Sequence, residues 1–213
     1  MHDALPLVKI CGITRLSDAF AAVDAGAGAL GFIFYPASLR AIALSAAADI
    51  IRQLPPGVRR VGVFVNPNEN EVRQAIDQAG IDTVQLHGEE SPEFCARFAT
   101  VTRWKAFRIR DRSSLELLPA YLHLDAWLLD SHVHGQHGGT GATFAWDLAV
   151  EASTAGLPLV LAGGLTADNV TEAVHRVRPF AIDVSSGVES APGIKDPDKL
   201  RDFIRAAHAQ RQD

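Results

Sequence analysis

Two side chains that can exchange protons stand at the ends of short apolar runs. Cys11 closes the run LVKIC over residues 7–11, and Asp130 closes the run AWLLD over residues 126–130. A thiol and a carboxyl group that face one ligand from opposite sides can act as a general base and a general acid. These roles require the thiol pKa to fall from about 8.5 and the carboxyl pKa to rise from about 3.9. The apolar residues 127–129 favour such a rise, although a lone Cys is commonly a packing residue and a lone Asp a turn former.

Two loops have the composition of a phosphate site. The segment LAGGL (161–165) follows one apolar run, and the segment DVSSGVE (183–189) begins at the end of another. Glycine lets backbone N–H groups approach phosphate oxygens, and the residues after 189 leave room for a short extra helix whose dipole would add about half a positive charge. Taken singly, each loop could instead be a tight turn built for packing. The candidate phosphate ligands are Gly163, Gly164, Ser185, Ser186 and Gly187.

Lys9 and Cys11 share one face of the first run, because side chains alternate along a strand. If Cys11 points to the mouth of the protein, Lys9 lies buried beneath it, and a buried ammonium group needs a counter-ion. We expect Asp183, in the last apolar run, to be that partner.

Other polar residues follow the same kind of run. Gln85 and His87 end the run TVQLH (83–87), and Arg40 follows the second run, where it could hold a carboxylate through two hydrogen bonds. Cys95 lies in an amphipathic stretch and is expected to be a packing residue.

Three histidines follow Asp130 in the Gly-rich segment SHVHGQHGG, namely His132, His134 and His137. Clustered imidazoles can bind zinc, but this segment has no carboxylate or thiol at ligand spacing. A lid over the active site with hinges at Gly135, Gly138 and Gly139 is the preferred interpretation, and no metal is expected.

Eight apolar runs alternate with amphipathic stretches, which predicts eight strand–helix units. The strands are expected at 7–11, 29–34, 60–65, 83–87, 102–107, 126–130, 158–162 and 180–184, and the clearest helices at 17–26, 68–80, 166–177 and 196–210. The predicted helix caps are Ser17, Asn68, Thr166 and Asp196 at the N-termini, with Gly26 and Gly80 at the C-termini.

This alternation fits an open doubly wound sheet or a single eight-stranded parallel (β/α)8 TIM barrel with short loops. The barrel is favoured because no Gly-rich fingerprint follows the first strand. The polar residues also collect after the strands, where such barrels have their active sites.

Composition bounds the function. The chain has 213 residues and is expected to be one domain over residues 1–213. Its net charge is -5 and it has no basic stripe, so nucleic acid is not an expected partner. No run is long enough to span a membrane and no secretion signal is recognised, and two cysteines do not make a disulfide framework. A cytoplasmic enzyme is expected, and monomer and homodimer both stay open.

Taken together, the motifs VKICGIT, GFIFYPASLR, VGVFVN, VQLHGEE, LLDS, HGGTG, LAGGL and PFAIDVSSGVE…PGIKD resemble the phosphoribosylanthranilate isomerase family of tryptophan biosynthesis. The resemblance runs in order from residue 8 to residue 196. It implies a single (β/α)8 barrel without cofactor or metal, and a phosphorylated small-molecule substrate.

The resemblance also implies roles for residues. Asp130 would be the general acid and Cys11 the general base of an Amadori rearrangement. Arg40 would hold the anthranilate carboxylate, and the two glycine-containing loops the phosphate. The segment Gly138, Gly139, Thr140 and Gly141 would help to close over the ligand. Ala41 stands where the family commonly has a larger residue, so details of anthranilate packing stay open.

Two alternatives stay open on the sequence. A related sugar-phosphate isomerase or epimerase could share the barrel, although a metal-dependent one would need more strand-end ligands than His87 and Asp130. A non-catalytic sugar-phosphate binding protein would keep the phosphate loops and have no use for an acid and a base.

Overall fold

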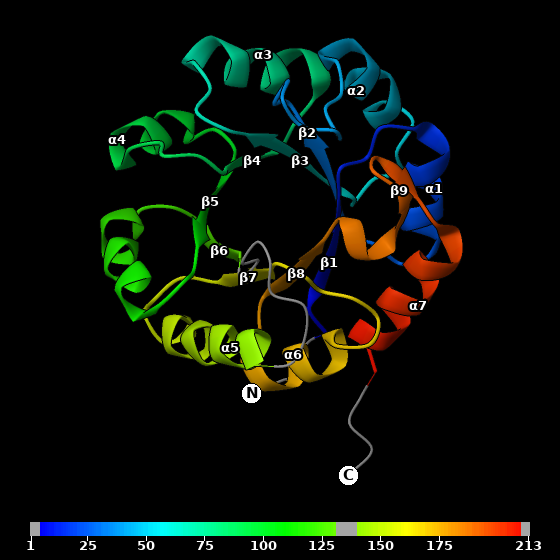
Figure 1. Ribbon diagram of the computed structural model, residues 1–213. Coiled ribbons are helices and arrows are strands. Elements are labelled where there is room, and N and C mark those ends of the chain that lie inside the picture. Colours follow the sequence, from blue (N-terminus) through cyan, green and yellow to red (C-terminus); the bar gives the residue numbers. More distant parts are fainter. Residues whose placement is uncertain (1–4, 131–139, 210–213) are drawn as a thin grey trace.

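Eight parallel strands close into a barrel in the order of the sequence, and helices surround it (Figure 1). The computed structural model describes residues 5–130 and 140–209, without the side chains of residues 140–145. The strands are β1 (Leu7–Cys11), β2 (Ala29–Ile33), β3 (Arg59–Phe64), β4 (Thr83–Leu86), β5 (Thr102–Arg108), β6 (Ala126–Asp130), β7 (Leu159–Ala162) and β8 (Ala181–Val184). The predicted (β/α)8 barrel is therefore confirmed.

The outer layer consists of α1 (Leu16–Asp24), α2 (Leu44–Ile51), α3 (Glu69–Ala79), α4 (Pro92–Cys95), α5 (Thr140–Ser153), α6 (Val170–Val177) and α7 (Pro197–Ala207). The described part of the chain also has the 3-10 helices η1 (Ala96–Phe98), η2 (Arg112–Tyr121) and η3 (Ser186–Val188). In the described part of the chain, no helix is long and apolar enough to cross a membrane.

Alternation along the strands divides the apolar residues between two cores. Trp127 and Leu129 of β6 pack in the core between strands and helices, whereas Leu128 packs in the core inside the barrel. Asp130, two residues beyond Leu128, lies on the same inner face at the end of the strand. Of the apolar residues expected to surround Asp130, only Leu128 therefore shares its face.

Local sequence signals fix some helix ends and not others. Asn68 caps α3 in a capping box with Glu71, and Asp196 accepts hydrogen bonds from two N–H groups at the start of α7, as predicted. The other two predicted N-caps are wrong. Ser17 lies inside α1, whose N-cap is Arg15, and α6 begins at Val170, so that Thr166 precedes the helix by four residues.

The segment after β8 differs from the prediction. The expected extra helix is only the three-residue η3, and the following residues form a two-stranded antiparallel hairpin of β9 (Glu189–Ala191) and β10 (Ile194–Lys195). Three residues of 3-10 helix build little macrodipole, so the expected dipole contribution to phosphate binding gains no support from this short element.

Candidate active site

Cys11 ends β1 and is 6% exposed, directly above a buried ion pair. Lys9 is fully buried, and its Nζ lies 2.8 Å from Oδ1 of Asp183 on the neighbouring strand β8. The predicted partner of the buried lysine is therefore confirmed. A buried ammonium group without this carboxylate would be strongly unfavourable.

The ion pair acts on the Cys11 thiol. Burial raises the pKa of Cys11, the charge of Lys9 lowers it, and the charge of Asp183 raises it again, so that the thiol pKa lies above its ordinary value. The fall expected for a general base is therefore absent in the protein without ligand. Burial also lowers the pKa of Lys9, but Asp183 and Cys11 outweigh this effect and keep Lys9 charged.

Asp130 ends β6 next to a short chain of polar side chains from β4. Nε2 of His87 lies 3.5 Å from Oδ2 of Asp130, and Nε2 of Gln85 lies 3.1 Å from Nδ1 of His87. When the Gln85 amide donates to Nδ1, that nitrogen is the acceptor and the ring proton is on Nε2, facing Asp130. The two predicted active-face residues Gln85 and His87 thus lie beside the predicted acid.

The backbones of the loops after β7 and β8 lie in direct contact. A Cβ on Gly187 would overlap the carbonyl oxygen of Leu165, so only glycine permits this contact. Gly163 and Gly164 both have positive φ angles, of 90° and 65°. The side chain of Asn169 fixes the first loop, since it donates to the Gly164 carbonyl at 3.0 Å and accepts from Thr166 N at 2.9 Å.

Ser185 joins the second loop to the end of β1. Its Oγ donates to the carbonyl oxygen of Cys11 at 3.1 Å. Of the predicted phosphate ligands, Ser185 therefore already uses its hydroxyl proton within the protein. The candidate loops lie together at the same end of the barrel as Cys11.

Arg40 lies over the end of β1. A Cβ on Gly12 would come within 2.7 Å of Cδ of Arg40 and 3.2 Å of Oγ of Ser185. The guanidinium is bound side-on by Glu189, with Nε at 2.8 Å from Oε1 and Nη2 at 2.6 Å from Oε2. The residue expected to grip a carboxylate is thus already paired with one from its own chain.

Several predicted residues lie outside what the structure describes. These are His132, His134, Gly135, His137, Gly138 and Gly139. Thr140 and Gly141, predicted as part of the closing loop, are the first residues of α5. Among residues 5–130 and 140–209, no three His, Cys, Asp or Glu side chains gather as metal ligands would.

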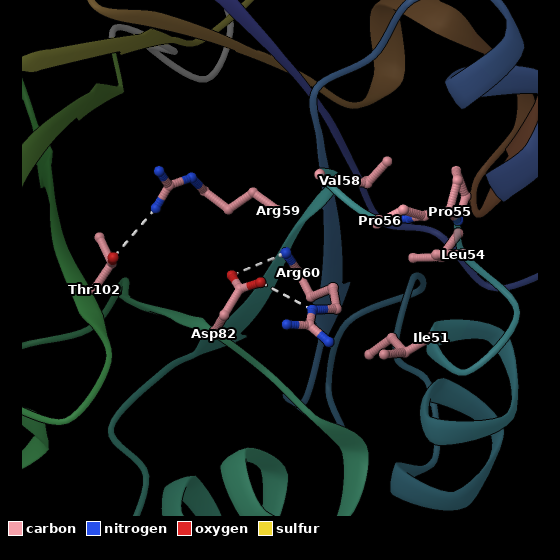
Figure 2. Close-up of a pocket in the computed structure, with 10 residues that line it drawn as sticks. Ile51, Leu54, Pro55, Pro56, Val58, Arg59, Arg60, Asp82 and Thr102 are labelled. Carbon is pink, nitrogen blue, oxygen red and sulfur yellow. Dashed lines mark hydrogen bonds and ion pairs between the residues drawn. The ribbon is translucent and has the colours of Figure 1, made fainter.

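A separate hollow lies elsewhere in the described structure. It has a volume of about 530 Å³ and is lined by residues before and at the start of β3, together with Asp82 and Thr102 near the starts of β4 and β5 (Figure 2). In this hollow Arg60 and Asp82 are paired at 2.8 Å. It lies at the opposite end of the strands from Cys11 and Asp130, and so it is not the active site.

Three residues of the site were missed in the sequence. Gly31 of β2 pairs in register with Cys11, and Glu189 and Lys195 of the hairpin are buried at 7% and 3% exposure. The sequence signal for the last two was a glutamate at the end of the second phosphate loop and a lysine 6 positions after it. Nothing in the local sequence distinguishes Gly31 from other glycines.

The fold and the strand-end residues define an enzyme of the (β/α)8-barrel class. The family model for N-(5'phosphoribosyl)anthranilate (PRA) isomerase matches residues 8–206, and the chain belongs to this family.

Relatives match over almost the whole chain. The N-(5'-phosphoribosyl)anthranilate isomerase of Pelobacter propionicus is 53% identical over 206 residues, 97% of each chain. The crystal structure of the Thermotoga maritima phosphoribosyl anthranilate isomerase superposes with a TM-score of 0.89 at 43% identity, covering 95% of this chain and 98% of that one. A second structure, of a phosphoribosyl anthranilate isomerase with reduced 1-(o-carboxyphenylamino)-1-deoxyribulose 5-phosphate, has a TM-score of 0.87 at 41% identity over 95% and 98% of the two chains.

Proposed function

We propose that the protein converts N-(5-phosphoribosyl)anthranilate into 1-(2-carboxyphenylamino)-1-deoxyribulose 5-phosphate, with Asp130 as the general acid and Cys11 as the general base. The observation that carries this assignment is the position of the two residues, each the last residue of its strand, on the non-adjacent strands β1 and β6. Membership of the isomerase family supports the reaction itself.

In the first step, protonated Asp130 gives its proton to the ring oxygen of the ribose. The bond between C1′ and that oxygen breaks, and the nitrogen lone pair forms a C=N double bond, which yields a Schiff-base cation. The carboxyl group must carry a proton at this stage, and the ring N–H of His87 is placed to keep Asp130 oriented.

In the second step, Cys11 as a thiolate removes the proton at C2′. The electrons of the C–H bond form a double bond between C1′ and C2′, and the C=N electrons return to nitrogen. The resulting enolamine tautomerises to the ketone. Because burial raises the pKa of the resting thiol, Lys9 directly beneath it has an essential part, since its charge favours the thiolate.

The ends of the substrate would be held by the two loops and by Arg40. Backbone N–H groups around Gly163, Gly164, Ser186 and Gly187 would bind the phosphate, and the open edge of the Arg40 guanidinium would bind the anthranilate carboxylate. No cofactor or metal is part of the proposal. Cytoplasmic location also belongs to it, because both cysteines, Cys11 and Cys95, are free thiols.

A fluorescence assay tests the proposed reaction. Wild-type protein should remove the anthranilate-type fluorescence of freshly prepared N-(5-phosphoribosyl)anthranilate, and Asp130→Asn should lower kcat by about 10²-fold or more. Absence of turnover in well-folded wild-type protein would contradict the reaction. Near-wild-type turnover of Asp130→Asn would contradict the assignment of the acid alone.

A further inference from the structure

The β9–β10 hairpin places a buried ion pair beside the active site. Nζ of Lys195 lies 2.8 Å from Oε1 of Glu189, and the side chains are 0% and 4% exposed. Gly193, in the turn between them, donates its N–H to the same Glu189 oxygen at 3.2 Å. Two residues of its own hairpin therefore hold the Glu189 carboxylate in place.

The same Glu189 carboxylate also binds one edge of Arg40. Nε of Arg40 contacts both carboxylate oxygens, at 2.8 and 3.1 Å, and Nη2 contacts Oε2 at 2.6 Å. This is the side-on bidentate geometry of an arginine–carboxylate pair. In the described part of the chain no hydrogen bond reaches Nη1, so the end-on edge formed by Nη1 and Nη2 is available to a ligand.

Lys195 ties the same group to the ends of the barrel strands. Its Nζ donates to the carbonyl oxygens of Cys11 and Ser185, at 2.6 and 3.3 Å. The backbone N–H of Lys195 donates to Asp18, whose carboxylate also pairs with Arg15. The hairpin is therefore fastened to β1 and to the loop after β8, and Arg40 is fastened to the hairpin.

The charges of this group do not cancel. Arg40 and Lys195 carry two positive charges against the single negative charge of Glu189. Lys195 is buried, whereas the Arg40 side chain is 24% exposed, so the surplus positive charge is presented at the open edge of Arg40. That edge is suited to one further carboxylate.

We infer that Glu189 is a positioning residue for substrate recognition, which fixes Arg40 through its Nε edge so that the end-on edge can bind the substrate carboxylate. The inference rests on the proposed carboxylate-binding role of Arg40. It makes the hairpin a determinant of specificity for substrates that carry a carboxylate on the aromatic ring. The opposite interpretation is that Glu189 occupies Arg40 as a competitor, which the substrate must displace.

A pair of ligands separates these interpretations. The first is reduced 1-(o-carboxyphenylamino)-1-deoxyribulose 5-phosphate, and the second is the same compound without the carboxyl group. The ratio of their Kd values measures carboxylate recognition alone, since the phosphate and the sugar chain are common to both. The ratio is measured for wild type, Glu189→Gln, Arg40→Lys and the double variant, alongside kcat and KM for the natural reaction.

We expect Glu189→Gln to raise the Kd of the carboxylated ligand by about 10-fold or more. The Kd of the ligand without the carboxyl group should rise by less than about 2-fold. KM should rise with a smaller change in kcat, and Glu189→Gln should have no further effect on the ratio when Arg40 is already Lys. Asp82→Asn is the matched control, because it removes a carboxylate from Arg60 at the far end of the barrel. It should leave the ratio and KM unchanged.

Each other outcome has a defined meaning. If wild type does not prefer the carboxylated ligand, the proposed role of Arg40 fails. If wild type prefers it and Glu189→Gln prefers it equally, only the inference about Glu189 is overturned. Tighter binding of the carboxylated ligand by Glu189→Gln would overturn it in favour of competition. Should Glu189→Gln not fold, Glu189→Asp keeps the charge but shortens the reach to Arg40, and the same loss of preference is expected.

Discussion

Gly31 lies directly opposite Cys11 across the β1–β2 ladder, and it is the missing side chain of Gly31 that makes room for the thiol. A Cβ at this position would come within 2.9 Å of Sγ of Cys11 and 3.1 Å of Cε of Lys9. The sulfur of Cys11 and the last methylene group of Lys9 therefore both lie in space that any other side chain at position 31 would enter.

Gly31→Ala should accordingly lower kcat by about 10-fold or more, because a displacement of the base by a fraction of an ångström is costly to catalysis. Gly62→Ala is the matched control: its Cβ would meet the Phe64 ring at 2.9 Å, away from Cys11. Both variants should lose about 1–3 kcal/mol of stability by overpacking. Equal kcat losses in steady-state assays of the two variants would contradict a specific role for Gly31.

The resting Cys11 thiol should titrate above the ordinary range of a cysteine, because burial raises its pKa and Lys9 offsets this only in part. Ultraviolet absorbance of the thiolate against pH measures the transition. The Cys95→Ala background removes the second thiol, whose pKa burial raises to about 11. A Cys11 pKa at or below neutrality in the protein without ligand would contradict this account of the site.

Replacing Lys9 should affect both stability and titration. Lys9→Met leaves Asp183 buried without its cation, and breaking such a pair costs about 3–5 kcal/mol. The same variant removes the charge that lowers the Cys11 pKa, so the thiolate should appear at higher pH than in wild type. Urea unfolding and the absorbance titration measure the two effects. An unchanged or lower Cys11 pKa in folded Lys9→Met would show that Lys9 does not favour the thiolate.

Glu189 should make the free energy of unfolding depend on pH in the acidic range. Burial raises the Glu189 pKa, but Arg40 and Lys195 outweigh burial and hold it below the ordinary value of 4.5. A carboxyl group with a lowered folded-state pKa stabilises the protein above its unfolded-state pKa, and this contribution is lost as pH falls through the folded-state value. The stability difference between wild type and Glu189→Gln should be constant near neutral pH and should shrink below about pH 4.5. Denaturant unfolding at several pH values measures it, and a difference that grows on acidification would contradict the pairing.

The sequence predicts the barrel well because most strands are apolar runs and several strand ends carry polar residues. Asp183 as the partner of Lys9 follows from alternation and closure alone, since strands one and eight become neighbours only in a closed barrel. The β9–β10 hairpin could not be predicted in this way. Its two short strands have no periodicity, and its contacts with Arg40 and Cys11 span about 150 and 184 positions of sequence.

The pairing of Gly31 with Cys11 could not be predicted from the sequence either. Gly31 has an ordinary strand conformation and gives no turn signal, and its importance comes from the side chains of the neighbouring strand. The raised Cys11 pKa likewise depends on how completely the barrel buries the thiol. The degree of burial cannot be predicted from the sequence pattern.

The central claim, that Cys11 is the base, is tested most directly by Cys11→Ser. A hydroxyl group in place of the thiol keeps the shape of the site but is a far weaker acid. The account predicts a fall in kcat of about 10²-fold or more in the fluorescence assay, with the Kd for reduced 1-(o-carboxyphenylamino)-1-deoxyribulose 5-phosphate unchanged within about 2-fold. Turnover near the wild-type rate in folded Cys11→Ser would contradict it.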